Sequence, residues 1–487
     1  MSHFHAAHCA SRAPLSRLWR ALSATLGLLL LAGSVTVSAQ SQSLSPATAK
    51  QIDHIVLQAL AKGDIPGASV AIERHGVVIY QKGFGFADLE NKVPVTPQSV
   101  FPIGSITKTM TALAIQQLIA EGKVDLNAPI GRYLPRLPEP DRNVRIRYLL
   151  DHTSGIPNYT EIPGFPNGAQ APMTRQDILR WFDSRPLLFP SGTRWSYTNS
   201  GYYLLGLVIE TVSGMSYDQY LRAHIFTPFG MSATTLAGWA PLVDHRAHGY
   251  RRHGNSLENA PRYDPLLPFS AGGVMSTAGD LLQYRHAVFG SGAVPVLIRN
   301  RLLQRDRLPD AFLLPYSLGG LVISRFEGHR RIGHPGDIDG FAVQYSYYPD
   351  DGLTVVILTN TDTSPFPPTS IEQKIVRILF GLSQPVIKDL PLPPATADSL
   401  RGEYAVGDMR FGFDRMAFVA VSGRLEMEIG GEGAPAIPLR YQGDLQFVSS
   451  VDDEQQIAFE GTRRGMRVIV MFYGSPLALH RISAAAH

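Results

Sequence analysis

A serine and a lysine three residues apart, Ser105 and Lys108, have the types and the spacing that could do chemistry. Residues three apart lie on one face of a helix, so the ammonium of Lys108 can reach the hydroxyl of Ser105. A serine hydroxyl becomes nucleophilic when a base takes its proton, and a buried lysine with a lowered pKa can be that base. The alternative is a capping serine beside a solvated lysine. Lys108 is the only one of eight lysines with a serine three positions earlier, which favours the catalytic interpretation.

Two later segments carry groups that can transfer protons or contact a substrate. A Tyr-Thr-Asn segment at 197–199 enters an apolar, helix-like stretch, and a His-Pro-Gly segment at 334–336 precedes a predicted strand. Together with Ser105-x-x-Lys108, and in this order, they resemble the motifs of the serine β-lactamase and penicillin-binding-protein superfamily. The most similar branch is that of the class C β-lactamases and the D-peptidases and esterases. The resemblance covers roughly residues 51–382 and includes supporting segments at 149–155, 271–277 and 358–360.

The resemblance implies a role for each residue of the first two motifs. Ser105 would attack a carbonyl group and form an acyl-enzyme. Lys108 and Tyr197 would share the proton transfers: from Ser105, to the leaving group, and from the water that deacylates the enzyme. Asn199 would orient Lys108 and donate its amide to the substrate.

The third motif departs from the pattern of many relatives, which carry Lys-Thr-Gly at this place. Here His334 stands where the lysine would be, so a permanent positive charge is missing. A histidine occurs there in the peptidase and esterase branch, and it could hydrogen-bond Tyr197 or, when charged, bind a substrate carboxylate. By position, the backbone N–H groups of Ser105 and Asp337 would form the oxyanion hole, with Gly336 beside them.

The resemblance therefore implies a serine hydrolase that cleaves an amide or an ester through an acyl-enzyme on Ser105, and the first 39 residues predict that it is exported. A D-peptidase or esterase is preferred over a class C-like β-lactamase, because the charge that would hold a penicillin carboxylate is missing. A non-turnover penicillin-binding or sensor module is the alternative from a different class.

Other potential sites have simpler interpretations. His152, in the segment 151–155, could be a catalytic base, but a hydrogen bond that fixes its loop is the favoured role. The sequence has no Gly-x-Ser-x-Gly, His-Glu-x-x-His or Walker motif, which argues against an α/β-hydrolase, a zinc peptidase or an NTPase. No cofactor and no metal ion are expected.

The nucleophile needs a buried helix and a sheet beside it. Apolar residues fall on nearly every side of the segment 105–121, which predicts a buried helix. A hairpin is predicted at 68–80 and strands at 341–347 and 353–358, all expected in one antiparallel sheet. The stretch from about 105 to 315 would be a long helical insertion, with a ligand-binding cleft between it and the sheet. The expected fold class is α+β, with an antiparallel sheet flanked by helices, as in β-lactamases and transpeptidases.

Composition divides the chain into four segments. Residues 1–39 combine arginines, an apolar run and small residues before Gln40, which predicts a cleavable signal peptide. The hydrolase domain is expected at 45–383 and a proline-rich linker at 384–397. Short alternating runs in 398–487 predict a small, all-β, barrel-like C-terminal domain.

The overall composition limits the classes of partner that we expect for this protein. The 487 residues are 44% hydrophobic and 17% charged, as expected for a globular protein. The formal charge of +3 comes from three arginines in the first 39 residues, and the neutral remainder predicts no nucleic-acid binding. Cys9, the only cysteine, would leave with the signal peptide, so no disulfide is expected. We expect a periplasmic or secreted protein with a small-molecule or peptide substrate and without stable membrane insertion; the oligomeric state is left open.

Overall fold

The computed structural model describes residues 44–165, 172–238, 242–254, 256–262, 264–406, 409–410, 415–430, 436–461, 465–472 and 475–482. The predicted signal peptide lies outside the described residues. No helix within the described ranges is both long enough and apolar enough to cross a membrane.

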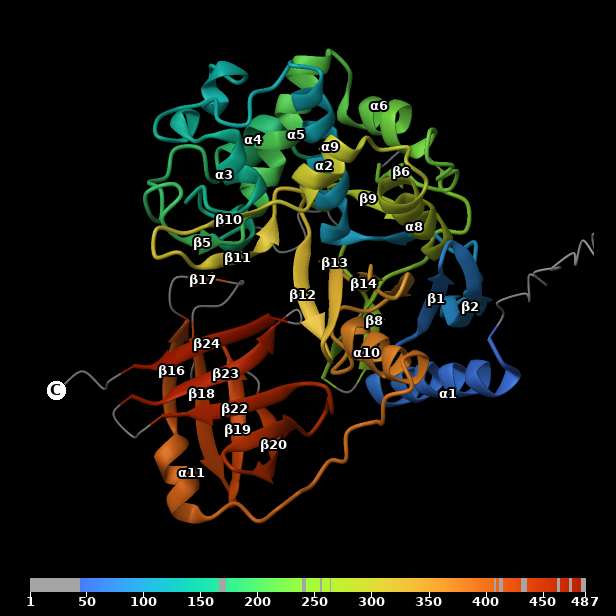
Figure 1. The fold of residues 1–487 in the computed structure, drawn as a ribbon, viewed down its shortest axis with the longest axis vertical. Coiled ribbons are helices and arrows are strands. Elements are labelled where there is room, and N and C mark those ends of the chain that lie inside the picture. The colour runs from blue at the N-terminus through green and yellow to red at the C-terminus, as the bar shows by residue number, and fades with distance from the viewer. Residues whose placement is uncertain are drawn as a thin grey trace, which may run out of the picture. The chain divides into compact units, whose positions relative to one another are not determined.

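A nine-stranded antiparallel sheet lies at the centre of the part that precedes the barrel (residues 44–383), with the strand order β10-β11-β12-β13-β14-β15-β1-β2-β3 (Figure 1). Strand β1 pairs with β15, with Val70 opposite Ile357, so segments from both ends of this part share one sheet as predicted. The bounds are β1 Gly67–Arg74, β2 Val77–Asp88, β3 Val93–Pro94, β10 Arg305–Arg307, β11 Leu313–Ser317, β12 Val322–Phe326, β13 His329–Ile338, β14 Phe341–Tyr348 and β15 Leu353–Thr359.

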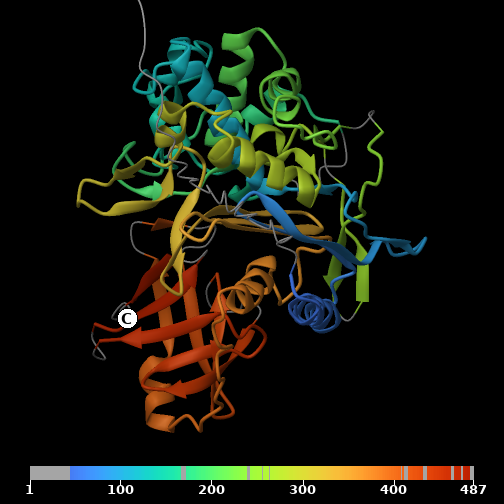
Figure 2. The ribbon, with the colours of Figure 1, turned by 45° about the vertical axis from the view of Figure 1, so that its right-hand side comes forward.

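Helices cover both faces of this sheet (Figure 2). Successive side chains of a strand point to opposite faces. Ala71 therefore joins the core that contains α2, whereas Val70 and Ile72 join the core built with α1 and α10. This explains why the central strands read as continuous apolar runs. The helices are α1 Pro46–Gly63, α2 Thr107–Ala120, α3 Ile146–Leu150, α4 Arg175–Leu179, α5 Asn199–Ser213, α6 Tyr217–Leu221, α7 Phe269–Gly272, α8 Ala278–Arg285, α9 Val296–Leu302, α10 Pro368–Leu379 and α11 Pro394–Leu400.

The insertion between about 105 and 315 is less purely helical than predicted. Strands β10 and β11 extend the edge of the central sheet, although β10 lies wholly inside the expected insertion. These strands are too short for a recognisable alternation of apolar and polar residues. The other short strands are β4 Phe101–Pro102, β5 Trp195–Ser196, β6 Thr235–Leu236, β7 Tyr250–His253, β8 Ser256–Asn259 and β9 Val274–Ser276.

The C-terminal part is a closed eight-stranded barrel, which confirms the predicted barrel-like fold. Strand β16 pairs with both β18 and β24 and thereby closes the barrel. Its interior is filled by aromatic side chains such as Tyr404, Phe418 and Phe459. Helix α11 begins at Pro394, inside the predicted linker. The barrel strands are β16 Gly402–Val406, β18 Arg415–Val421, β19 Arg424–Ile429, β20 Ala436–Gly443, β21 Gln446–Ser449, β22 Gln456–Glu460, β23 Arg467–Phe472 and β24 Ser475–Arg481.

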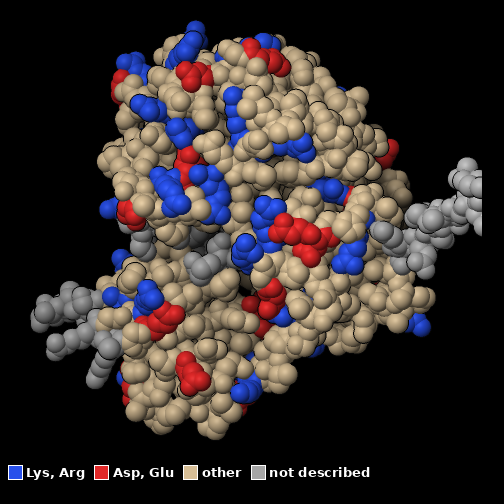
Figure 3. Space-filling view, in the orientation of Figure 1, with Lys and Arg blue, Asp and Glu red and all other residues tan. Residues whose placement is uncertain are grey.

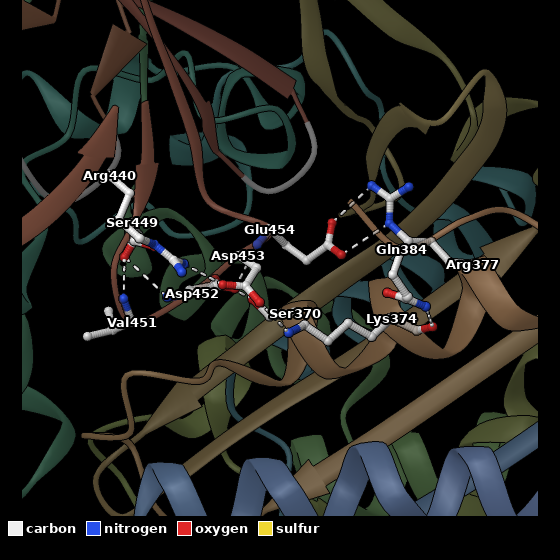
Figure 4. A network of polar contacts seen from close by, with 10 residues as sticks. All are labelled: Ser370, Lys374, Arg377, Gln384, Arg440, Ser449, Val451, Asp452, Asp453 and Glu454. Atoms are coloured by element: carbon white, nitrogen blue, oxygen red, sulfur yellow. Dashed lines mark hydrogen bonds and ion pairs between the residues drawn. The ribbon is translucent and has the colours of Figure 1, made fainter. Parts of the chain in front are cut away.

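Buried polar contacts join the barrel to α10 (Figure 4). The guanidinium of Arg377 donates to the carboxylate of Glu454 at 3.1 Å, and both side chains are at most 7% exposed. The Ser370 hydroxyl donates to Asp452 in the same loop of the barrel. A second contact is the parallel pairing of β17 (Met409–Arg410), which follows β16 in the chain, with β5. The barrel therefore reaches the strand that leads into Tyr197.

Charged side chains of both signs are interspersed over the face of the molecule shown in Figure 3. Ion pairs between such side chains include Arg147 with Asp306 at 2.7 Å and Arg330 with Asp350 at 2.9 Å. Because each pair combines a positive and a negative charge, the electrostatic field near it has both signs.

Candidate active site

The side chains of Lys108 and Tyr197, which come from two separate segments of the chain, both lie at the hydroxyl of Ser105. Ser105 lies in a single 3₁₀ turn, Gly104–Ile106, that leads directly into α2. The Nζ of Lys108 lies 3.0 Å from the Ser105 Oγ, and the Tyr197 hydroxyl donates to the same Oγ at 2.8 Å. The structure thus brings together the nucleophile and both of the proton-transfer groups expected from the sequence.

Lys108 is buried in a setting that favours its neutral form. Its side chain is 0% exposed, and burial holds its pKa well below the ordinary value. The Nζ donates to the Oδ1 of Asn199 at 2.8 Å and to the carbonyl oxygen of Ala271 at 2.7 Å. A neutral amine that donates to these two acceptors keeps its lone pair for the Ser105 proton. Asn199 therefore orients Lys108 as the resemblance implied.

The N-terminus of α5 holds the second motif. Thr198 is the N-cap residue, so Tyr197 lies in extended chain between β5 and the helix, and Asn199 is the first helical residue. The N–H of Asn199 donates to the Oδ1 of Asn158 at 3.1 Å, which satisfies one of the free donors of the helix start. The Nδ2 of Asn199 donates to Thr160 at 3.3 Å.

The third motif lies on β13 and approaches the turn around Ser105 through two glycines. A Cβ on Gly336 would lie 2.1 Å from the Ile103 carbonyl oxygen, and a Cβ on Gly104 would lie 2.9 Å from the Asp337 nitrogen. Gly104 also has a φ of +48°, which a side chain disfavours. The glycines therefore allow the backbone of Asp337 to lie against the turn that carries Ser105. By its position, the role of Asp337 at the oxyanion hole would be that of a backbone donor.

His334 hydrogen-bonds a tyrosine that the sequence analysis did not single out. The Tyr316 hydroxyl lies 3.0 Å from its Nε2, while its Nδ1 contacts the carbonyl oxygen of Pro335. With Nδ1 as donor, the Nε2 accepts from Tyr316. Burial and the nearby Lys108 lower the pKa of His334 to about 3, so the ring is neutral near pH 7. The pKa is lowered mainly because His334 lies on a buried strand, where the residue is only 3% exposed.

A cavity of about 520 Å³ adjoins the site. Gly272 and Ile338 line it, and they directly follow Ala271 and Asp337 in the chain. The cavity thus lies between the sheet and the helical part, where a cleft was expected. Its charged lining residues carry both signs: Asp88, Glu90, Asp339, Arg246 and Arg262.

One cluster at this cavity has the composition of a metal site. Ligand atoms of Asp88, Glu90 and His248 all lie within 4.8 Å of one another. The carboxylates already accept hydrogen bonds, however, from Asn91 at 2.7 Å and from Tyr250 at 2.6 Å. Hydrogen bonds within the chain therefore account for their arrangement, and the absence of a metal ion stays a prediction.

Two contributors to the site were missed in the sequence. The Ala271 carbonyl binds Lys108, but a backbone carbonyl leaves no mark on residue type; its presence in the supporting segment 271–277 was the only signal. Tyr316, the partner of His334, has no motif of its own. His152 lies behind Tyr197, and its Nδ1 accepts from the Thr198 N–H at 3.1 Å, in agreement with the loop-fixing role.

Comparisons with known proteins agree with this geometry. The profile of the family described as Beta-lactamase matches residues 52–379. Penicillin-binding protein 4* of Bacillus subtilis (strain 168) is 30% identical over 338 residues, which are 66% of this chain and 73% of that protein. Protein flp of Staphylococcus aureus (strain MW2) is 28% identical over 328 residues, 65% of this chain and 64% of its own length, so this chain spans less than two thirds of it.

A solved structure is similar over the same part of the chain. The D-stereospecific amidohydrolase from Streptomyces sp. has a TM-score of 0.58 and 26% sequence identity, and the match covers 69% of this chain and 99% of that one. The chain therefore belongs to the beta-lactamase family, within the superfamily of serine β-lactamases and penicillin-binding proteins.

Proposed function

We propose that this protein is a serine hydrolase that cleaves an amide or ester bond through an acyl-enzyme on Ser105. One observation carries the proposal. The Ser105 Oγ lies within hydrogen-bond distance of both a fully buried lysine, Lys108, and a tyrosine hydroxyl, that of Tyr197. A hydroxyl held by two groups that can exchange its proton is the arrangement that nucleophilic catalysis requires.

In the acylation step, the Ser105 Oγ bonds to the substrate carbonyl carbon while its proton passes to the Lys108 and Tyr197 pair. The negative charge that develops on the carbonyl oxygen is stabilised by the backbone N–H groups of Ser105 and Asp337. The carbon–nitrogen or carbon–oxygen bond then breaks, and the leaving group takes the proton from the same pair.

Deacylation repeats these steps with water in place of serine. The Lys108 and Tyr197 pair takes a proton from the water as its oxygen bonds to the acyl carbon. The ester bond to Ser105 then breaks, and the serine oxygen recovers its proton. The products are a carboxylic acid and the amine or alcohol released earlier.

Within this class, the charge of the third motif favours a D-peptidase, amidase or esterase. A neutral His334 supplies no positive charge to a carboxylate beside the scissile bond. Substrates that carry such a carboxylate, as penicillins do, therefore lose one attraction. The similarity to a D-stereospecific amidohydrolase supports amides of D-amino acids as the first substrates to test.

We also propose that the mature protein begins at Gln40 after export. Support comes from the basic start, the apolar run and the small residues of the first 39 positions. Mass spectrometry of the N-terminus, on protein recovered from the periplasm or the medium, would test this. An N-terminus that retains residues 1–39 would contradict it.

A substrate panel tests the hydrolase proposal. It contains p-nitrophenyl esters, D-amino-acid amides, peptides ending in D-Ala-D-Ala, and nitrocefin, each with the wild type and with Ser105→Ala. We expect turnover of an ester or D-amino-acid amide that disappears in the variant, and an acyl adduct that maps to Ser105. Fastest turnover of nitrocefin would favour a β-lactamase, and a stable adduct without turnover would favour a sensor. Activity that survives in Ser105→Ala would refute the proposed nucleophile.

A further inference from the structure

His152 is a buried residue that the mechanism above does not use. It follows the short helix α3, its side chain is 0% exposed, and its φ is +64°. Few residues other than glycine adopt this backbone conformation, although Asn, Asp and His do so more often than the rest. Its place therefore depends on specific contacts.

These contacts surround Tyr197. The backbone carbonyl of His152 accepts from the N–H of Ser196 at 2.9 Å, and its Nδ1 accepts from the N–H of Thr198 at 3.1 Å. The residues on either side of Tyr197 are thus both bound to His152. The imidazole also lies against the Tyr197 ring, with centroids 4.3 Å apart and planes inclined by 35°. His152 therefore binds the backbone on both sides of Tyr197 and also packs against the face of its ring.

The protonation state of His152 suits this role. Its Nδ1 accepts a hydrogen bond, so the proton of the neutral ring is on Nε2. Burial lowers the pKa of His152 well below its ordinary value. The acceptor lone pair is therefore kept over the working range of pH.

The surroundings of the other ring nitrogen, Nε2, indicate that His152 has a role other than stabilising the fold. The Nε2 has no hydrogen-bond partner among the described residues, and the ring is packed against Trp195, Tyr202 and Tyr316. A buried N–H without a partner is destabilising. An apolar side chain would avoid this cost but could not accept from Thr198.

We propose that His152 is a positioning residue that sets the place of the Tyr197 hydroxyl and, through Thr198, of the helix start that carries Asn199. Since Asn199 accepts from Lys108, both proton-transfer groups depend on it. The inference rests on the proposed function, because it concerns proton transfer at Ser105. His152 does not exchange protons itself.

Two variants separate the contacts. Asparagine tolerates the positive φ, and its Oδ1 is bonded to Cγ as Nδ1 is, so His152→Asn keeps an acceptor for Thr198 but loses the ring. His152→Ala loses both. Ile375→Ala is the control, because Ile375 is buried in the core between the sheet and α10 and touches no site residue.

The measured quantity is the acylation rate constant of Ser105 per active site, with active sites titrated by a fluorescent fluorophosphonate. A displacement near 1 Å costs on the order of 100-fold in rate, so we expect about that loss in His152→Ala, about a tenfold loss in His152→Asn, and an unchanged KM for a p-nitrophenyl ester. Ile375→Ala should lose stability but keep the rate constant.

The outcomes are distinguishable. If the wild type is not labelled at Ser105, the proposed function itself fails. If it is labelled and either His152 variant acylates at the wild-type rate per site, the positioning role is refuted. A changed KM with an unchanged acylation rate constant would also refute the positioning role. Should His152→Ala fail to fold, the rate of His152→Asn decides.

Discussion

Replacing Gly336 by alanine would test whether the close approach of β13 to the turn before α2 builds the oxyanion hole. A Cβ at position 336 would lie 2.1 Å from the carbonyl oxygen of Ile103, whereas real contacts of this kind are essentially never under 3.0 Å. The strand must therefore move away by about 1 Å, and the neighbouring Asp337 N–H must move with it.

The expected cost follows from the size of this shift. A misplacement of about 1 Å costs about 100-fold in rate, and loss of one oxyanion donor costs about 100- to 1,000-fold, or about 2.7–4 kcal/mol. We expect Gly336→Ala to lower the acylation rate constant of Ser105 by a factor in this range.

Stopped-flow acylation by an activated ester, normalised to titrated sites, would measure this. The matched control is Gly83→Ala in β2, where a Cβ would also lie 2.1 Å from a backbone carbonyl oxygen, that of Val95. Both variants should lose stability, but only Gly336→Ala should lose rate per site. A rate within threefold of the wild type, or an equal loss in Gly83→Ala, would refute the reasoning.

Three further predictions concern charge. Lys108→Arg places a permanent cation beside the nucleophile and removes the base. Acylation should therefore slow by about 10²- to 10⁴-fold. A rate near that of the wild type would contradict the assignment of Lys108 as a base. The pKa of His334 is about 3 in the folded state against an ordinary 6.5, so the unfolded state binds more protons between these values. Stability should fall as the pH drops from about 6.5 towards 3, and urea unfolding of His334→Gln should show a weaker dependence over that window. Arg377→Ala leaves Glu454 buried without its partner and should destabilise by about 3–5 kcal/mol in urea, whereas Arg415→Ala breaks an exposed pair and should cost under about 1 kcal/mol. Equal losses in the last two variants would show that the junction with the barrel is not a buried ion pair.

Local patterns in the sequence were sufficient for much of the fold. The pairing of Ser105 with Lys108 follows from helical spacing, and the burial of α2 follows from apolar residues on all its sides. The hairpin of β1 and β2 and the strands β14 and β15 were recognisable because alternation and turn residues are local signals. In the barrel, the runs 417–421 and 468–472 were recognisable for the same reason and lie in β18 and β23, whereas the run 411–413 lies outside the described residues.

Long-range contacts decided the rest. Tyr197 lies 92 residues from Ser105, and motif order could suggest their meeting but not its geometry. The pairing of β17 with β5 was not foreseen, because two residues of backbone carry no pattern.

By itself, the sequence determined which groups are available for chemistry and which of them share a helix face, because residue type and spacing are properties of the chain. Only the tertiary structure decided that Lys108 is buried, that His334 binds Tyr316 and is neutral, and that the ring of His152 packs against that of Tyr197. The physical reason is that burial, and the pKa that follows from it, depends on every segment packed around a group rather than on its neighbours along the chain.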